Sequence, residues 1–202
     1  GLKPGEPVES MGIPMSVTLG PGILNNIFDG IERPLKVLET KSGAFIERGL
    51  NISAVDMEKK WNVTLSCKAG DKVKPGNIFA STPETSLITH KIMVPAGIAG
   101  EVVETVPDGP YTVNDTLVKI KNEKGVITEL NMLQKWPIRT ARPTRERKPI
   151  SRPLITGQRV IDTLLPIAKG GAAAVPGGFG TGKTMTQNQL AKWCDAYIIV
   201  YI

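Results

Sequence analysis

The chain has 202 residues, the length of one domain or of pieces of two. Its 21 glycines and 16 prolines favour many turns and exclude a helical bundle, while 41 % hydrophobic and 22 % charged residues exclude disorder. Cys67 and Cys194 form no CxxC pair, and His90 is the single histidine, so the composition excludes a disulfide framework, a thiolate zinc site and a His-rich metal site.

The first 39 residues contain Gly-Pro turns followed by apolar residues at the spacing of one helix face. Ile23, Leu24, Ile27, Phe28 and Ile31 predict a short helix that stops before Pro34. We expect this helix to pack against a core rather than to bind a partner.

From residue 40 to residue 135 the pattern changes to short alternating runs separated by Asp-Gly, Pro-Gly and Ala-Gly breaks. Such runs predict a small all-β module. The predicted strands are 61–65, 76–80, 100–104, 111–113 and 116–121.

The net charge of +6 is concentrated in one segment, 134–152, which carries seven basic residues and one acidic residue. Four prolines interleave with these charges, so 136–153 is predicted to be an extended, solvated connector. A nucleic-acid site is the less favoured interpretation, because no groove-reading helix or set of stacking aromatics accompanies the charge. The residues concerned are Lys135, Arg139, Arg142, Arg145, Arg147, Lys148 and Arg152, with Glu146 and Pro137, Pro143, Pro149 and Pro153.

The last part, 154–202, has the pattern of an α/β domain. Val160, Ile161, Leu164 and Leu165 predict a helix that ends at Pro166. Residues 172–175 predict a short buried strand, 183–193 a helix and 197–202 a second strand. Together these elements predict one parallel βαβ unit.

The strongest motif of the chain is Gly177-Gly-Phe-Gly-Thr-Gly-Lys-Thr184, which fits the phosphate-binding loop GxxxxGK[ST]. Its glycines let backbone N–H groups approach phosphate oxygens, and the following helix directs its positive dipole end at the same anion. Lys183 is predicted to contact the β- and γ-phosphates of ATP, or the β-phosphate of ADP, and the Thr184 hydroxyl to ligate Mg²⁺. The predicted nucleotide-binding residues are Gly177, Gly178, Phe179, Gly180, Thr181, Gly182, Lys183 and Thr184.

Hydrolysis also needs a carboxylate that positions Mg²⁺ and a group that orients water. Asp195 is the one carboxylate after Lys183, and it precedes the last apolar run. We therefore expect the chain to be a piece of a longer polypeptide and to be inactive alone. No apolar run approaches the roughly 20 residues of a membrane helix, and no signal peptide opens the chain, which predicts a soluble, cytosolic protein.

Several segments closely resemble the catalytic A subunit of archaeal and bacterial V/A-type rotary ATPases. The segment 152–171 and the phosphate loop carry the likeness most strongly. The β module matches the bulge insertion of A subunits, which F-type β subunits and type III export ATPases lack. Gly178 departs from the family, many members of which have proline there. The other matching segments are 19–24, 28–34, 134–137 and 186–193.

The resemblance implies ATP hydrolysis or synthesis coupled to rotation and to H⁺ or Na⁺ transport. It implies a headpiece peripheral to the cytoplasmic face of a membrane, in which A alternates with the non-catalytic B subunit in a six-membered ring. Central and peripheral stalk subunits are further implied partners, and nucleic acid is not. It also implies that Gly1 lies near the end of an N-terminal β-barrel, so that 1–39 joins that barrel to the bulge module. The implied catalytic glutamate, Mg²⁺-positioning aspartate and adenine-contacting aromatics fall beyond Ile202.

Two alternative functions remain. One is a flagellar or type III export ATPase, against which the bulge argues. The other is a lipoyl or biotinyl carrier, because 70–78 and 94–102 are similar to the two hairpin signatures of such domains. Carriers need a lysine at a hairpin tip, whereas Thr85–His90 contains none and Lys91 lies too near the second signature.

Overall fold

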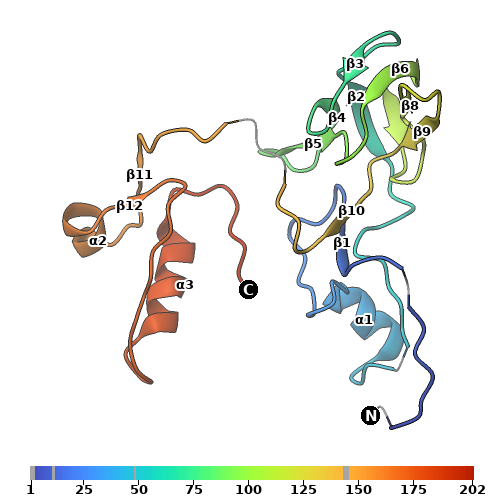
Figure 1. The fold of residues 1–202 in the computed structure, drawn as a ribbon. Helices are drawn as coiled ribbons and strands as arrows, with labels where there is room; N and C mark the ends of the chain where they lie inside the picture. The colour runs from blue at the N-terminus through green and yellow to red at the C-terminus, as the bar shows by residue number, and fades with distance from the viewer. Residues whose placement is uncertain (1–2, 11, 48, 143–145) are drawn as a thin grey trace. The chain divides into compact units, whose positions relative to one another are not determined.

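The computed structural model describes residues 3–10, 12–47, 49–142 and 146–202. It divides into two compact units, residues 1–144 and 145–202 (Figure 1). Arg145 and Pro143 of the predicted connector lie outside the described residues. The domain boundaries at 39, 135 and 153 stay predictions.

The first unit contains one helix and ten strands in its described residues. In chain order they are β1 (Ser16–Leu19), α1 (Leu35–Ser42), β2 (Trp61–Leu65), β3 (Lys72–Val73), β4 (Ile78–Pro83), β5 (Thr89–Met93), β6 (Gly100–Thr105), β7 (Gly109–Tyr111), β8 (Val118–Lys121), β9 (Ile127–Leu130) and β10 (Gln134–Pro137). These strands confirm the predicted all-β module.

Most of these strands form two four-stranded antiparallel sheets, ordered β5-β4-β2-β7 and β3-β6-β8-β9. The two sheets share one hydrophobic core. Buried and exposed side chains alternate along the strands, as in Trp61 and Val63 of β2, because successive residues of a strand point to opposite faces. Burial of each large apolar side chain contributes roughly 1.5–3 kcal/mol. The most completely buried large side chains are Phe79, Ile92, Leu117, Ile120, Met132, Val63, Val94, Val102, Val113 and Val118.

The N-terminal segment contacts this module through β1, which pairs with β10 from Ser16↔Pro137 to Leu19↔Gln134. The outer edge of β1 is partly covered, because the Glu32 carboxylate accepts a hydrogen bond of 2.7 Å from the Thr18 N–H. Burial raises the pKa of Glu32 above its ordinary range. An edge strand whose N–H groups are occupied is a poorer template for aggregation.

The helix predicted over 23–31 is wrong. The structure has turns there, and the helix α1 begins only after Pro34. Asn25 and Glu32 both have positive φ, a conformation that a right-handed helix cannot contain. Asp29 further fixes a loop, since its carboxylate accepts hydrogen bonds from the N–H groups of Ile31 and Arg33. The sequence pattern predicts that a helix ends before Pro34, whereas in the structure Pro34 precedes the first residue of α1. The fixed φ and missing N–H of proline are compatible with either position.

A buried carboxylate joins the N-terminal segment to the hairpin between β4 and β5. Glu84 accepts hydrogen bonds from the N–H groups of Gly22 at 2.6 Å and Leu24 at 3.3 Å, and its other oxygen lies 3.3 Å from His90 Nδ1. Burial lowers the pKa of His90 below 6.5, with a smaller effect of Arg142 in the same direction and an opposing effect of Glu84.

This burial predicts that acid destabilises the first unit through His90. A group whose pKa is lower in the folded state stabilises it fully above its unfolded pKa, and that contribution is lost as the pH falls. We therefore expect the free energy of unfolding to decrease below pH 6.5, and to decrease less steeply in His90→Gln. Urea denaturation of both chains across this range measures the difference, and identical slopes would contradict the prediction.

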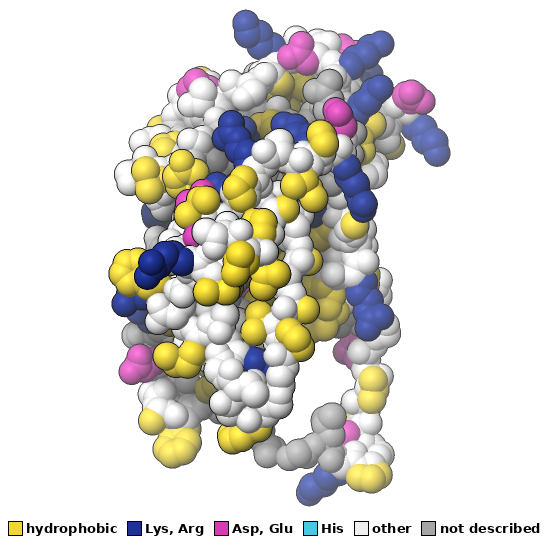
Figure 2. Space-filling view, turned by 90° about the vertical axis from the view of Figure 1, so that its left-hand side faces the viewer, with side chains coloured by type: hydrophobic (Ala, Val, Ile, Leu, Met, Phe, Trp, Pro, Cys, Tyr) yellow, Lys and Arg dark blue, Asp and Glu magenta, His cyan; other side chains and the backbone are white. Residues whose placement is uncertain are grey.

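The second unit contains β11 (Pro153–Leu154), α2 (Arg159–Leu164), β12 (Ile167–Ala168) and α3 (Lys183–Trp193) in its described residues. Both predicted helices are confirmed, α3 with the predicted bounds. The antiparallel pair β11-β12 has no counterpart among the predicted elements. Neither α2 nor α3 has a buried residue, and Figure 2 shows many hydrophobic side chains open on the face toward the viewer.

The two strands predicted at 172–175 and 197–202 are wrong for this structure, because neither run is in a strand. Parallel strands are stabilised by ladder hydrogen bonds to a neighbour, and among the described residues neither run has one. Tyr197 and Val200 are exposed accordingly. Of the predicted βαβ unit, the helix alone is formed here.

Candidate phosphate-binding site

The predicted phosphate loop lies at the N-terminal end of α3. Gly182 is the N-cap residue, with φ 81° and ψ 17°, and Gly180 also has a φ of 81°. These left-handed values disfavour side chains with a Cβ, which explains two of the motif's glycines. The glycines of the motif therefore allow the left-handed backbone conformation that leads into α3.

The loop curls back on itself, so that its first glycine and its lysine meet. The Lys183 Nζ donates a hydrogen bond of 2.5 Å to the carbonyl oxygen of Gly177. Across the turn, the Thr181 hydroxyl donates one of 2.9 Å to the Gly178 carbonyl. A Cβ on Gly177 would lie 2.4 Å from the Thr181 Oγ1, so only glycine fits there without displacing the threonine.

The first turn of α3 is suited to an anion. The N–H groups of a helix's first turn have no partner within the helix, and the first acceptor in the ladder is Gly182, which receives the Thr186 N–H at 2.9 Å. Among the described residues no side chain caps this end, and the first turn contains no acidic residue. The dipole and the Lys183 ammonium add positive potential at the same place.

Thr184 and Phe179 complete the predicted set. Thr184 is the second residue of α3 and is exposed beside Lys183, while Phe179 is fully exposed in the loop. All eight predicted residues are therefore brought together at one helix end. In the described part of the chain no three His, Cys, Asp or Glu side chains form a metal cluster. Thr184 can thus offer Mg²⁺ a single oxygen, and phosphate and water oxygens would have to complete the shell that this ion prefers.

Asp195 is engaged in structural contacts rather than left open for a metal. Its Oδ2 accepts a hydrogen bond of 2.6 Å from Lys169 Nζ, and its Oδ1 accepts one of 3.1 Å from the Ile155 N–H. These contacts, chiefly that of Lys169, lower the pKa of Asp195. Both carboxylate oxygens of Asp195 are thus occupied by contacts within the second unit.

Sequence reasoning missed a second aspartate that organises the segment before α2. Both the N–H and the hydroxyl of Thr156 donate to Asp162 Oδ1, at 2.9 and 2.7 Å, and the Gly157 N–H donates to Oδ2 at 3.1 Å. These bonds lower the pKa of Asp162. An acidic residue in the first turn of a predicted helix, after Thr-Gly, was the available signal.

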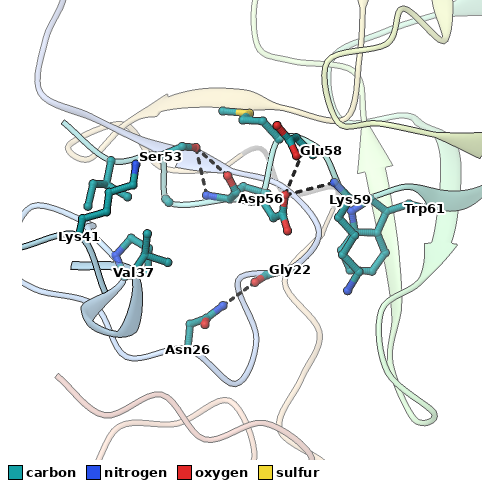
Figure 3. Close-up of a pocket in the computed structure, with 14 residues that line it drawn as sticks. Gly22, Asn26, Val37, Lys41, Ser53, Asp56, Glu58, Lys59 and Trp61 are labelled. Carbon is teal, nitrogen blue, oxygen red and sulfur yellow. Dashed lines mark hydrogen bonds between the residues drawn. The ribbon is translucent and has the colours of Figure 1, made fainter. Parts of the chain in front are cut away.

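The first unit has a groove of about 600 Å³ between α1 and the segment 52–61. Figure 3 shows Lys41 and Val37 on one side of it and Lys59 and Trp61 on the other. The Lys59 ammonium lies 3.9 Å from the centre of the Trp61 ring, and Asp56 accepts hydrogen bonds from the N–H groups of Glu58 and Lys59. The charged groups of Asp56 and Lys59 are thus engaged within the segment 52–61, and the groove contains none of the predicted site residues.

The hairpin expected to carry a swinging cofactor in a carrier domain has no lysine at its tip. The turn after β4 is closed by a hydrogen bond from the Glu84 N–H to the Ile88 carbonyl, and Leu87 is exposed there. Lys91 lies within β5, opposite Ser81. This arrangement leaves the carrier chemistry without its attachment point.

Within the described residues, no helix has the length and apolar character that crossing a bilayer requires.

The comparisons with known proteins cover both units. Residues 52–139 match the ATP synthase alpha/beta subunit barrel-sandwich domain, and residues 157–202 match the nucleotide-binding domain of the ATP synthase alpha/beta family. The chain is 56 % identical to the V-type ATP synthase alpha chain of Halothermothrix orenii over 201 residues. It is 54 % identical over 202 residues to the A subunits of the A-type ATP synthases of Methanopyrus kandleri and Thermococcus sibiricus. Each alignment covers 100 % of this chain and 34 % of the relative, so the chain spans about a third of their length.

Proposed function

The chain belongs to the ATP synthase alpha/beta family, and from this membership we propose that it is the phosphate-binding part of a V/A-type catalytic A subunit. In this role the intact protein hydrolyses or synthesises ATP. The observation that carries the proposal is the loop 177–184, which closes around Lys183 at the start of α3. A polyphosphate is held where backbone amide donors and a cation meet, and the start of α3 and Lys183 are the groups proposed to supply them.

The backbone amides of the loop, the Lys183 ammonium and the Thr184 hydroxyl have different proposed parts. The backbone N–H groups from Gly177 to Lys183 hold the β- and γ-phosphates, and the Lys183 ammonium leaves the Gly177 carbonyl to neutralise charge on the γ-phosphate. The Thr184 hydroxyl is the chain's ligand for Mg²⁺. Thr184 would hold Mg²⁺ together with the bound nucleotide, and the ion would supply positive charge against the charge that develops in the transition state.

The wider assembly is also part of the proposal. The relatives are named as V-type and A-type ATP synthase subunits. These names support a place in a multi-subunit assembly. We propose that in this assembly the protein is part of a peripheral headpiece, alternates with B subunits in a ring and contacts stalk subunits. Coupling to H⁺ or Na⁺ transport at the cytoplasmic face of a membrane belongs to that assembly. Among the alternatives, no observation favours an export ATPase, and the lysine-free hairpin tip disfavours a carrier.

The 202-residue chain alone is expected to release no phosphate from MgATP, because its one carboxylate after Lys183 is paired with Lys169. The intact assembly that contains the chain is expected to turn over MgATP. Phosphate release per mole of protein, measured for the chain alone and for the intact assembly, tests this difference in activity. An intact assembly without turnover would contradict the proposed function, and turnover by the chain alone would contradict the assignment of Asp195.

A further inference from the structure

We propose that residues 138–142, which follow β10, form a strap over the edge of the first unit, and that acid releases this strap through His90. The proposal goes beyond the phosphate site and does not depend on it, because every group that it uses belongs to the first unit. The strap precedes the point at which the chain passes from the first unit to the second. Its release adds the length of 138–142, up to about 17 Å of extended chain, to the segment that joins the two units.

Contacts with β10 and with the N-terminal segment close the strap. The Ile138 N–H donates to the Met15 carbonyl at 3.0 Å, and the Thr140 carbonyl accepts a hydrogen bond of 2.7 Å from the Trp136 indole N–H. The Arg142 guanidinium lies 4.5 Å from the centre of the Trp136 ring, and a cation over the face of an indole is attracted by the ring's electrons. The strap therefore closes over a buried tryptophan of β10 through one hydrogen bond and one stacked cation.

His90, on β5, is exposed to the charge of the strap's arginine and to that of a neighbouring carboxylate. Its Nδ1 lies 3.3 Å from Glu84 Oε2. Burial lowers the pKa of His90 below 6.5, and the positive charge of Arg142 acts in the same direction, whereas Glu84 raises the pKa. Among the described residues, Glu84 and Arg142 are the charged groups that act on this imidazole. In the closed form, burial and the strap therefore both disfavour a proton on His90.

Opening the strap removes both of these effects at once. Arg142 moves away and water reaches the imidazole, so His90 binds a proton more readily in the open form than in the closed form. As the pH falls, the equilibrium shifts toward the form that binds more protons. The Glu84 carboxylate acts differently, because it attracts the imidazolium. The hairpin that carries Glu84, with its hydrogen bonds from Gly22 and Leu24, therefore stays closed while the strap opens.

The opening of the strap is local and needs less free energy than unfolding of the whole unit. Residues 138–142 contribute no member to the hydrophobic core that the two sheets share, and the side chain of Ile138 is exposed. Segments with few buried apolar contacts open at a lower free energy than the strands of a core. The strap can therefore be released while both four-stranded sheets remain folded.

Limited proteolysis of the 202-residue chain with trypsin tests the proposal, because Arg139 places a cleavable bond inside the strap. The cleavage rate of a transiently opened segment follows the population of the open form. The rate after Arg139 is divided by the rate after Lys124, in the exposed turn between β8 and β9, to correct for the effect of pH on the protease. Cleavage after Lys91, inside β5, reports unfolding of the whole unit.

Between pH 7.5 and pH 6.0 we expect this ratio of rates to rise about threefold, without cleavage after Lys91. In His90→Gln the ratio is expected to be independent of pH, because the group that binds the proton is gone. In Arg142→Gln the ratio is expected to be higher at pH 7.5 than in the unaltered chain, because the strap has lost its stacked cation. Arg147→Gln removes an exposed arginine from the connector and is the matched control, which should behave as the unaltered chain does.

An NMR titration of the imidazole gives a second measurement, because His90 is the single histidine of the chain. The pKa of His90 is expected to lie below 6.5 in the unaltered chain and closer to 6.5 in Arg142→Gln. The proposal is overturned if the ratio of rates does not change with pH, if His90→Gln retains the change, or if cleavage after Lys91 rises in step. An identical titration in Arg142→Gln would also overturn it. None of these outcomes bears on the phosphate site, which Lys183→Ala tests separately.

Discussion

Replacing Lys183 with alanine in the intact assembly is expected to lower MgATP turnover by about 10²–10³-fold, the usual cost of removing one charge-stabilising group from a transition state. The Lys183 ammonium is the one cation that the loop itself provides, and it lies 2.5 Å from the carbonyl oxygen of Gly177, the first residue of the loop. Without it the γ-phosphate loses its partner, while the loop's amides remain. Phosphate release under saturating MgATP measures the loss.

Two further lysine variants sharpen this result. Lys192→Ala removes a lysine from the last turn of the same helix, where its ammonium lies 5.0 Å from the centre of the Trp193 ring, and should leave turnover unchanged. Lys183→Arg keeps the charge but replaces a compact ammonium with a planar guanidinium, so it should recover part of the activity at most. Full turnover in Lys183→Ala would refute the role assigned to the loop.

Local patterns predict the elements whose stability is largely local. The sequence pattern places strand β2 over 61–65 and helix α3 over 183–193, and both have these bounds in the structure. In β2 the alternation of apolar and polar residues coincides with burial, and in α3 the glycine at the N-cap marks the start. The strands predicted around residues 78, 102 and 119 are confirmed for the same reason, with bounds shifted by a few residues.

Non-local contacts account for what the sequence does not predict. The pairing of β1 with β10 joins residues more than a hundred positions apart, and nothing in either segment alone indicates the partner. The apolar spacing of 23–31 fits a helix, but the Leu24 N–H donates to Glu84, which lies sixty residues further along the chain, and Asn25 has a positive φ. Tertiary contacts thus override a helical period that is present in the sequence.

In the candidate site too, local groups are predicted from the sequence and groups that depend on distant partners are not. Every residue of the loop 177–184 comes from one contiguous motif, because a phosphate loop is built from neighbouring backbone groups. The structural roles of Asp162 and Asp195 escape prediction, because their partners Thr156, Ile155 and Lys169 come close only after folding. A motif predicts the groups that touch a ligand, whereas the groups that hold the motif in place need the fold.

The largest stability effect is expected at Gly100, the first residue of β6, because a side chain there would collide with the backbone of a neighbouring strand. A Cβ at this position would lie 2.1 Å from the carbonyl oxygen of Lys121 and 2.7 Å from its carbonyl carbon. Both are backbone atoms of β8, which is held in register with β6 and β9. Neither can move as a flexible side chain would, so the two strands must separate.

Gly100→Ala is therefore expected to reduce the free energy of unfolding of the first unit by about 3–4 kcal/mol, in the range of severe core disruption. Gly125→Ala, in the turn between β8 and β9, is the matched control. It has a φ of +81°, but a Cβ there meets only the flexible end of Lys121 at 4.0 Å. Its cost should be about 1 kcal/mol, that of the left-handed backbone alone. Urea denaturation measures the loss of stability in each variant. A larger loss in Gly100→Ala than in Gly125→Ala is expected from the collision with β8, and equal losses would mean that this contact contributes nothing.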